Sequence, residues 1–169
     1  MQIVRRRDAT AAGGHVVQMS VLFKELKALI KSFNEHEVEF ALCGGLAVAA
    51  HGLVRATEDI DFLIRVESLE KAFAAAAEIG FDIHGLDISF KERTVEIRRV
   101  SKIVGEDVIS LDLLLVTDAV EDVWENRMDR EFLGEAIAVV SREGLIKMKQ
   151  QAGRPQDLLD IDRLENERG

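Results

Sequence analysis

The chain has 169 residues, a length that predicts one domain with a substantial core. Its 47% hydrophobic and 31% charged residues, with 12 glycines and one proline, are typical of a globular protein and exclude disordered and fibrous chains. The formal net charge of -9 repels phosphate backbones and argues against an extended nucleic acid as a partner.

The cellular compartment is predicted from the same composition. Charged residues interrupt every apolar run before the roughly 18 residues that a membrane helix needs, so we expect no membrane span. The single cysteine, Cys43, cannot form an intramolecular disulfide, and no basic start followed by an apolar segment opens the chain. These features predict a cytoplasmic protein.

The opening segment differs from the remainder of the chain. Residues 1–18 mix basic, small and flexible side chains without a period and predict a flexible N-terminal arm, whereas residues 19–169 predict a single domain. From Met19 to about Glu35, apolar side chains recur at helical spacing, which predicts a surface helix packed on a core.

The next segments alternate between strands and helices. We expect a short buried strand over residues 39–43, a turn at Gly44 and Gly45, and a small helix that ends at Gly52. The later predicted elements are a strand over 59–65, an alanine-rich helix over 67–80, a mixed segment over 81–90, strands over 93–100, 107–116 and 135–141, a helix near 118–127, and two helices over 142–167 broken at Gly153 with Pro155 in the first turn of the second. This order predicts an α/β (α+β) fold in which helices flank a mixed sheet and further helices follow at the C-terminus.

Three aspartates stand out because they interrupt apolar strands. Side chains alternate between the two faces of a strand, so Asp59 and Asp61 point to one face while their apolar neighbours point to the other. Asp112 interrupts the strand over 107–116 in the same way. If the two strands are neighbours in the sheet, the three carboxylates converge.

A cation would relieve the repulsion in such a cluster. Three carboxylates close together raise one another's pKa and destabilise the fold unless positive charge lies among them. Oxygen ligands of this kind suit Mg²⁺, and two ions roughly 3.5 to 4 Å apart can hold the attacking and leaving oxygens of a phosphoryl or nucleotidyl transfer. A D-x-D pair alone is also common at solvent-exposed strand ends, and a glycine pair alone marks many turns.

The combined pattern resembles the nucleotidyltransferase superfamily that includes DNA polymerase β. Its signature is an apolar residue, G-[G/S], a gap of nine to thirteen residues and D-h-[D/E]-h, which Cys43-Gly44-Gly45 and Asp59-Ile60-Asp61-Phe62 match. The form "GGLAVAAHGLVRATEDIDFLI" is similar to the AbiEii/AbiGii-type toxins and to the aminoglycoside and lincosamide nucleotidyltransferases. The ending "LIKMKQQAGRPQDLLDI" is similar to the AbiEii-type ending, although those toxins usually carry an added helical domain.

The resemblance implies roles for individual residues. Asp59 and Asp61 would bind two Mg²⁺ ions, and Asp112 would ligate the catalytic ion and help activate the acceptor hydroxyl. The nucleotide-binding residues implied are Gly44, Gly45, Arg55, Thr57 and Lys147. Plainer alternatives are open: Lys147 as a surface helix lysine, Arg55 as a loop cation paired with Glu58 or a neighbour, and Thr57 as a turn residue. Near the C-terminus, Asp157 would stabilise the start of the last helix, with Asp160 one turn further on the same face.

We therefore expect a Mg²⁺-dependent nucleotidyltransferase. It would move a nucleoside monophosphate from a nucleoside triphosphate to a hydroxyl of a small molecule, a protein or a tRNA and release pyrophosphate. The alternatives are a catalytically silent nucleotide-binding regulatory domain of the same fold and a purely structural interaction domain. A second copy of the chain or an antitoxin-like protein is left open as a partner.

Overall fold

The computed structural model describes residues 17–167. Residues 1–16, which make up most of the predicted N-terminal arm, lie outside the described residues. The helices are α2 (Met19–Glu35), α3 (Gly44–Ala50), α4 (Leu69–Glu78), α5 (Glu121–Glu125), α6 (Arg142–Ala152) and α7 (Pro155–Asn166). The strands are β1 (Ala41–Cys43), β2 (Asp59–Ile64), β3 (Ile83–His84), β4 (Ile88–Phe90), β5 (Val95–Val104), β6 (Asp107–Leu115), β7 (Met128–Phe132) and β8 (Glu135–Val139).

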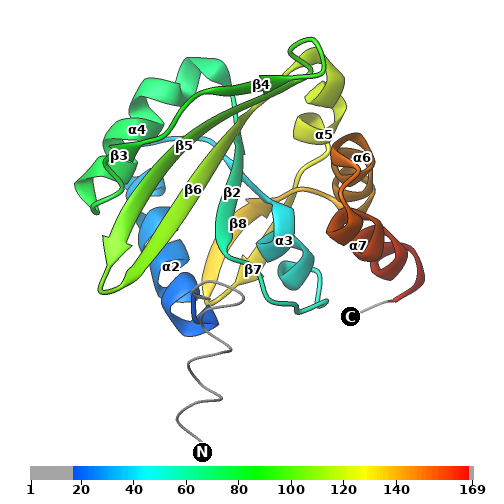
Figure 1. The fold of residues 1–169 in the computed structure, drawn as a ribbon, viewed down its shortest axis with the longest axis horizontal. Helices are drawn as coiled ribbons and strands as arrows, with labels where there is room; N and C mark the ends of the chain where they lie inside the picture. Colours follow the sequence, from blue (N-terminus) through cyan, green and yellow to red (C-terminus); the bar gives the residue numbers. More distant parts are fainter. Residues whose placement is uncertain (1–16, 168–169) are drawn as a thin grey trace, which may run out of the picture.

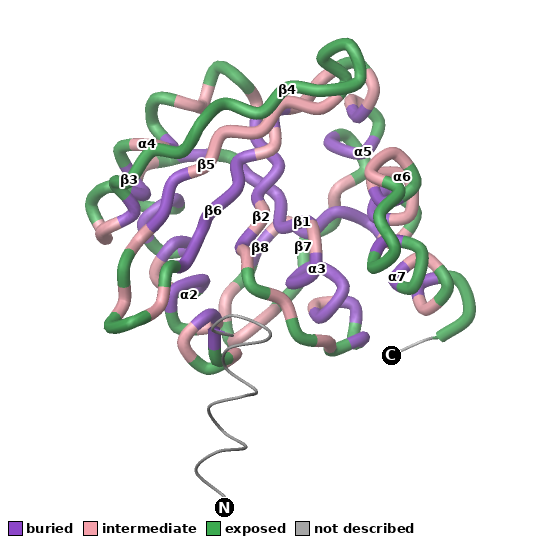
Figure 2. The backbone as a smooth tube through the Cα atoms, viewed as in Figure 1, coloured by how far each residue is buried: buried purple, intermediate pink, exposed green. Residues whose placement is uncertain are grey.

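The strands form one mixed sheet, which confirms the predicted fold class. Its order is β3-β5-β6-β2-β1-β8-β7, with β4 paired to β5. The pairs β2–β6 and β1–β8 are parallel, and β1–β2, β5–β6 and β7–β8 are antiparallel. The central strands β2 and β6 are largely buried, whereas β4 at the rim is exposed (Figure 2).

Strand β2 divides the sheet into an apolar face and a face that carries the aspartates. Ile60, Phe62 and Ile64 are fully buried on the apolar face. The ring of Phe62 lies 5.1 Å from that of Phe33 of α2, centroid to centroid, so α2 covers this face. Helix α4 packs beside α2, where Ser32 donates a hydrogen bond to the carbonyl of Ala75. The other face of β2 carries Asp59 and Asp61.

The remaining helices lie on the side of the sheet that carries the aspartates. Helices α6 and α7 pack against each other and lie on the opposite side of the molecule from α2 and α4 (Figure 1). The predicted break between α6 and α7 is confirmed: Gly153 ends α6 with a left-handed φ of 66°, and Pro155 occupies the first turn of α7. Among residues 17–167, no helix combines the length and the apolar character needed to cross a bilayer.

Some elements differ from the prediction. Helix α3 begins at Gly44, so the two glycines lie inside its first turn and not in a separate turn before it. The mixed segment over 81–90 forms the two short strands β3 and β4. Strand β7 was not predicted because its sequence, MDREF, is mostly polar and exposed and lacks apolar alternation.

The buried aromatic contact between the sheet and α2 predicts a large stability effect. Phe62 also contacts Phe40 at a centroid distance of 4.4 Å, so Phe62→Ala would leave a cavity in the core. We expect the free energy of unfolding to fall by about 3 to 5 kcal/mol, measured by urea denaturation. Val108→Ala, at a position 57% exposed, should change it far less. Similar losses for the two variants would contradict this packing.

Candidate active site

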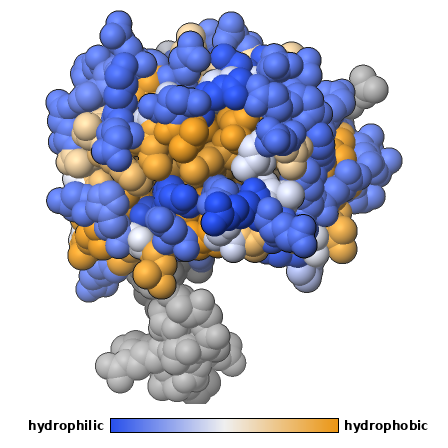
Figure 3. Space-filling model, turned by 90° about the horizontal axis from the view of Figure 1, so that it is seen from above, coloured by the Kyte–Doolittle hydropathy of each residue, from blue (hydrophilic) through white to orange (hydrophobic). Residues whose placement is uncertain are grey.

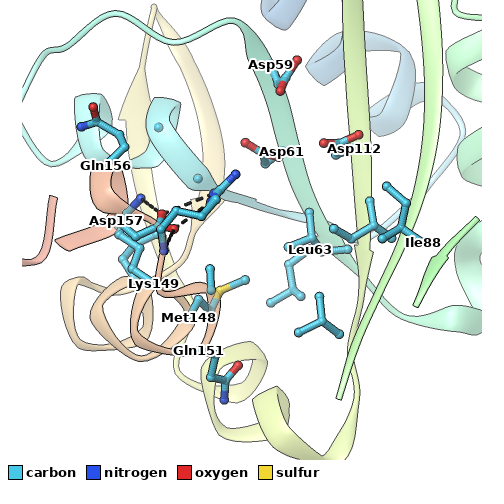
Figure 4. Close-up of a pocket in the computed structure, with 18 of the residues that line it drawn as sticks. Asp59, Asp61, Leu63, Ile88, Asp112, Met148, Lys149, Gln151, Gln156 and Asp157 are labelled. Carbon is cyan, nitrogen blue, oxygen red and sulfur yellow. Dashed lines mark hydrogen bonds and ion pairs between the residues drawn. The ribbon is translucent and has the colours of Figure 1, made fainter. Parts of the chain in front are cut away.

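The pairing of β2 with β6 brings the predicted carboxylates together. Asp61 lies directly opposite Asp112 across the parallel pair, and Asp59 lies two residues earlier on the same face of β2. Figure 4 shows the three side chains pointing into one cavity. The proximity that the sequence predicts for Asp59, Asp61 and Asp112 is therefore observed.

Arg99 of β5 supplies a positive charge that the sequence analysis did not include. It lies opposite Asp112 in the antiparallel β5–β6 pair. Its Nε and Nη2 atoms donate to the two carboxylate oxygens of Asp112 at 2.6 and 2.8 Å, and Nη2 also lies 3.6 Å from Asp59 Oδ2. The cluster is thus partly neutralised by the protein itself, most strongly at Asp112.

Asp61 is the carboxylate that lacks a cationic partner in contact with it. Among the described residues, no hydrogen bond or ion pair is formed by its side chain, although Arg99 and Lys149 lie nearby in the cavity. Burial, followed by the charges of Asp112 and Asp59, raises the pKa of Asp61 from 3.8 to about 7. Burial also raises the pKa of Asp59, and the Arg99 guanidinium opposes this shift.

Because they lack side chains, the two glycines of α3 allow Asp61 and Thr57 to lie close to the start of this helix. A Cβ on Gly44 would lie 2.7 Å from Asp61 Cγ, and Gly44 has a φ of 65°, which disfavours other residues. A Cβ on Gly45 would lie 2.8 Å from Thr57 Oγ1. Side chains at either position would therefore displace groups that line the cavity.

A buried ion cluster forms the cavity wall opposite the sheet. At its centre Asp160, which is fully buried, accepts two hydrogen bonds of 2.8 Å from Arg55 and one of 2.7 Å from Lys149. Gln156 donates a further hydrogen bond of 3.0 Å to Asp160. Burial alone would raise the pKa of Asp160, but the hydrogen bonds from Arg55 and Lys149 hold it below its ordinary value.

Asp157 and Arg154 join the same cluster at the start of α7. The Asp157 carboxylate accepts hydrogen bonds from the backbone N–H and the Nε of Arg154, at 3.1 and 2.8 Å, and lies 3.6 Å from Lys149 Nζ. The pKa of Asp157 is lowered by these partners, although burial acts in the opposite direction. Asp157 therefore caps the helix, as in the plainer alternative, and also helps to hold Lys149.

The structure separates Lys147 from this site. Its Nζ donates a 2.7 Å hydrogen bond to Asp122 on the exposed surface, and its side chain does not line the cavity. Lys149 lies in the cavity instead and is 5% exposed. The structure therefore corrects the expected position of Lys147: Lys149, and not Lys147, lines the cavity, because residues two apart on a helix point in nearly opposite directions.

The other nucleotide-binding residues predicted from the sequence do line the cavity. They are Gly44, Gly45, Arg55 and Thr57. Arg55 is paired with Asp160 and not with Glu58, its plainer alternative. The cavity has a volume of about 800 Å³. Its basic wall, formed by Arg55, Lys149 and Arg154, faces the sheet, where the aspartates lie beside apolar residues of the same strands (Figure 4).

The donor set was tested for its fit to a divalent cation. Asp59 and Asp61 carry hard oxygen donors, and the raised pKa of Asp61 indicates a carboxylate short of positive charge; these two residues fit Mg²⁺. Within residues 17–167, no three acidic, His or Cys side chains form a ready-made metal site. Asp112 would join the donor set only if its carboxylate exchanged Arg99 for the ion.

A comparison with family models gives a match over most of the chain. The family model described as "Nucleotidyl transferase AbiEii toxin, Type IV TA system" matches residues 27–169. Among curated proteins, none has a significant sequence match.

Solved structures show the same fold. The lincomycin-bound lincosamide antibiotic adenylyltransferase LnuA is 18% identical with a TM-score of 0.61, and the alignment covers 90% of this chain and 99% of LnuA. ANT(2'')-Ia in complex with adenylyl-2''-tobramycin is 14% identical with a TM-score of 0.58, covering 85% of this chain and 87% of that one. The TM1012 protein of Thermotoga maritima is 16% identical with a TM-score of 0.60, covering 92% and 99% of the two chains.

The two lysines of α6 allow a matched test of the buried ion cluster. Lys149→Met leaves the carboxylates of Asp157 and Asp160 short of a buried counter-charge, so we expect the free energy of unfolding to fall by about 3 to 5 kcal/mol. Lys147→Met removes an exposed pair with Asp122 and should cost less than about 1 kcal/mol. Urea denaturation measures both, and equal losses would contradict the placement of Lys149.

The raised pKa of Asp61 predicts a pH dependence of stability in metal-free buffer. The unfolded chain releases this proton near pH 4, whereas the native protein retains it to about pH 7, so ionisation destabilises the native state as the pH rises through this interval. Asp61→Asn cannot ionise. Its free energy of unfolding relative to the wild type should therefore increase by roughly 2 to 4 kcal/mol from pH 4 to pH 8. A difference that does not change with pH would contradict the raised pKa.

Proposed function

The chain belongs to the AbiEii nucleotidyl transferase family, and from this membership we propose that it transfers a nucleoside monophosphate from a nucleoside triphosphate to a hydroxyl acceptor, with Mg²⁺ and with release of pyrophosphate. As a member of this family it is a nucleotidyltransferase. The ion, the acceptor and the roles of individual residues are the parts that we propose. The observation that carries the proposal is that Asp59, Asp61 and Asp112 meet on one face of the sheet and share a cavity with the basic wall.

The basic wall suits the triphosphate. Arg55, Lys149 and Arg154 line the side of the cavity formed by the loop before β2, α6 and the start of α7. Each of the three is already paired with a carboxylate, which fixes its position without requiring a substrate. We propose that these cations bind the β- and γ-phosphates, which leave as pyrophosphate.

Asp59 and Asp61 are the residues that would hold Mg²⁺. A bound divalent ion would neutralise charge on the triphosphate oxygens and stabilise the charge that develops during transfer. The two carboxylates contribute the hard oxygen donors, and the glycines beside them leave room for the substrate to approach. Asp112 joins them if Arg99 is displaced.

Asp112 is the group that we propose accepts the acceptor's proton. The acceptor oxygen forms a bond to the α-phosphorus, while the bond from that phosphorus to the bridging oxygen of pyrophosphate breaks. The hydroxyl proton passes to a carboxylate oxygen of Asp112. Arg99, which donates to both oxygens of Asp112, holds this carboxylate in a fixed orientation before the substrates bind.

Incubation with each α-labelled nucleoside triphosphate tests the proposal. With Mg²⁺ and a panel of hydroxyl acceptors, including proteins and tRNA, the wild type should transfer label and release pyrophosphate, and a chelator should stop both. Asp61→Asn should lower the rate on the order of a hundredfold or more. The control Asp82→Asn, at an exposed position outside the cavity, should retain the wild-type rate.

The same experiment separates the catalytic proposal from its alternative. Thermal stabilisation by a nucleoside triphosphate and Mg²⁺, with no transfer to any acceptor, would indicate a nucleotide-binding regulatory domain. The absence of both stabilisation and transfer would contradict a nucleotide site in this cavity. An antitoxin-like partner stays a prediction that rests on the family, which is described as the toxin of a type IV toxin–antitoxin system.

A further inference from the structure

The sheet carries an apolar row directly beside its charged row. The pairing registers align Arg99, Asp112 and Asp61 across β5, β6 and β2. The same registers align a second row two residues along each strand, which continues onto β4: Ile88, Ile97, Leu114 and Leu63. Because a strand rises about 3.3 Å per residue, the two rows lie about 7 Å apart.

This apolar row faces the cavity and part of it is open to solvent. All four of its residues line the cavity, together with Phe90 and Met148. Ile88 and Phe90 of β4 are 40% and 38% exposed, so the β4 end of the apolar surface is open to solvent. Figure 3 shows apolar side chains gathered on the face seen from above, with hydrophilic side chains around them.

The position of the apolar row relative to the basic wall indicates which of the two substrates, the nucleotide or the acceptor, the row contacts. In an in-line transfer, the attacking oxygen and the leaving pyrophosphate lie on opposite sides of the phosphorus. The cations proposed to bind the leaving phosphates lie on the helical side of the cavity and face the sheet that carries the aspartates (Figure 4). The acceptor hydroxyl must then approach from the sheet side, where Asp112 and the apolar row lie.

We propose that the acceptor is a small molecule whose reacting hydroxyl is attached to an apolar body, which packs on Ile88, Ile97, Leu114 and Leu63. This inference rests on the proposed function and specifies its substrate. About 7 Å between the rows is a suitable distance for a hydroxyl at Asp112 and a hydrocarbon or aromatic group on the neighbouring row.

The charges on this side of the cavity argue against the other acceptor classes. Arg99 is the cation that the β4, β5 and β6 residues contribute to the described lining, and Asp112 already engages it, so a nucleic-acid end would find little to bind its phosphates. A polycationic acceptor would need free carboxylates beside the apolar row. Glu96, next to Ile97, is already engaged by Arg98 and Ser89, so it offers such an acceptor little negative charge.

Two glucosides provide the test, because they differ only in the length of their alkyl chain. Isothermal titration would measure binding of hexyl β-glucoside, below its micelle concentration, and of methyl β-glucoside. A non-hydrolysable α,β-methylene nucleoside triphosphate and Mg²⁺ would be present to fill the nucleotide half of the cavity. The trinucleotide CCA would serve as the nucleic-acid probe.

The wild type should bind hexyl β-glucoside at least about tenfold more tightly than methyl β-glucoside, because the additional methylene groups are partly buried on the row. The double variant Ile88→Thr/Ile97→Thr should remove most of this difference and leave binding of the nucleotide analogue unchanged. Threonine is also β-branched and suits a strand. The control Ile103→Thr, at a position on β5 that is 63% exposed and outside the cavity, should retain the difference.

Several results would overturn the inference and leave the proposed function intact. They are equal binding of the two glucosides, a chain-length preference that survives in the double variant, and tighter binding of CCA than of hexyl β-glucoside. Weaker binding of the nucleotide analogue by the double variant would assign the apolar row to the nucleobase instead. If the wild type does not bind the nucleotide analogue at all, the proposed function itself is wrong.

Discussion

The alignment of β6 between β2 and β5 is the constraint on which the site depends. One register places Asp112 beside Asp61, and the other places Arg99 across from Asp112. A shift of one residue in either pair would turn these side chains to the apolar face under α2. The alignment is fixed on one side by the short connection at Gly105 and Glu106, which joins Val104 to Asp107. It is also fixed by the complete burial of Ile109, Leu111 and Leu113 of β6.

The basic wall depends on a second constraint, the burial of Asp160. Charges removed from water are costly unless paired and hydrogen-bonded, and Asp160 meets this condition through Arg55, Lys149 and Gln156. Because Asp160 belongs to α7, Lys149 to α6 and Arg55 to the loop before β2, the cluster connects the C-terminal helices to the central sheet. The fold therefore positions Arg55 and Lys149, and Asp160 neutralises part of their charge before a substrate enters the cavity.

Much of the fold could be predicted from the sequence because its strongest signals are local. The period of α2, the Gly153–Pro155 break and the apolar strands β2 and β6 are each determined by adjacent residues. Strand β7 could not be predicted in this way, because it is held in place by pairing with β8 and not by an apolar pattern of its own. The same distinction applies to the site: the D-x-D alternation is local, whereas the role of Asp160 depends on partners 11 and 105 positions away.

The sequence does contain signals for two site residues, Arg99 and Lys149. A two-residue turn at Gly105 and Glu106 pairs Val104 with Asp107. Counting outward from this pair along the two antiparallel strands places Arg99 opposite Asp112. On α6, Lys149 lies one turn after Leu145 on the buried face, whereas Lys147 lies on the opposite side. Burial of Asp160 had no comparable signal, because its position in the second turn of an amphipathic helix is equally suited to a solvated carboxylate.

The shared carboxylate of Asp160 also constrains how this protein can diverge. A change that neutralises position 160 would leave Arg55 and Lys149 repelling each other in a poorly hydrated space, and a change that neutralises either cation would leave the carboxylate undercompensated. Substitutions at these three positions are therefore tolerated only in combination. Among homologues, positions 55, 149 and 160 should covary, and drift at any one of them should be slow until a compensating change has occurred at another.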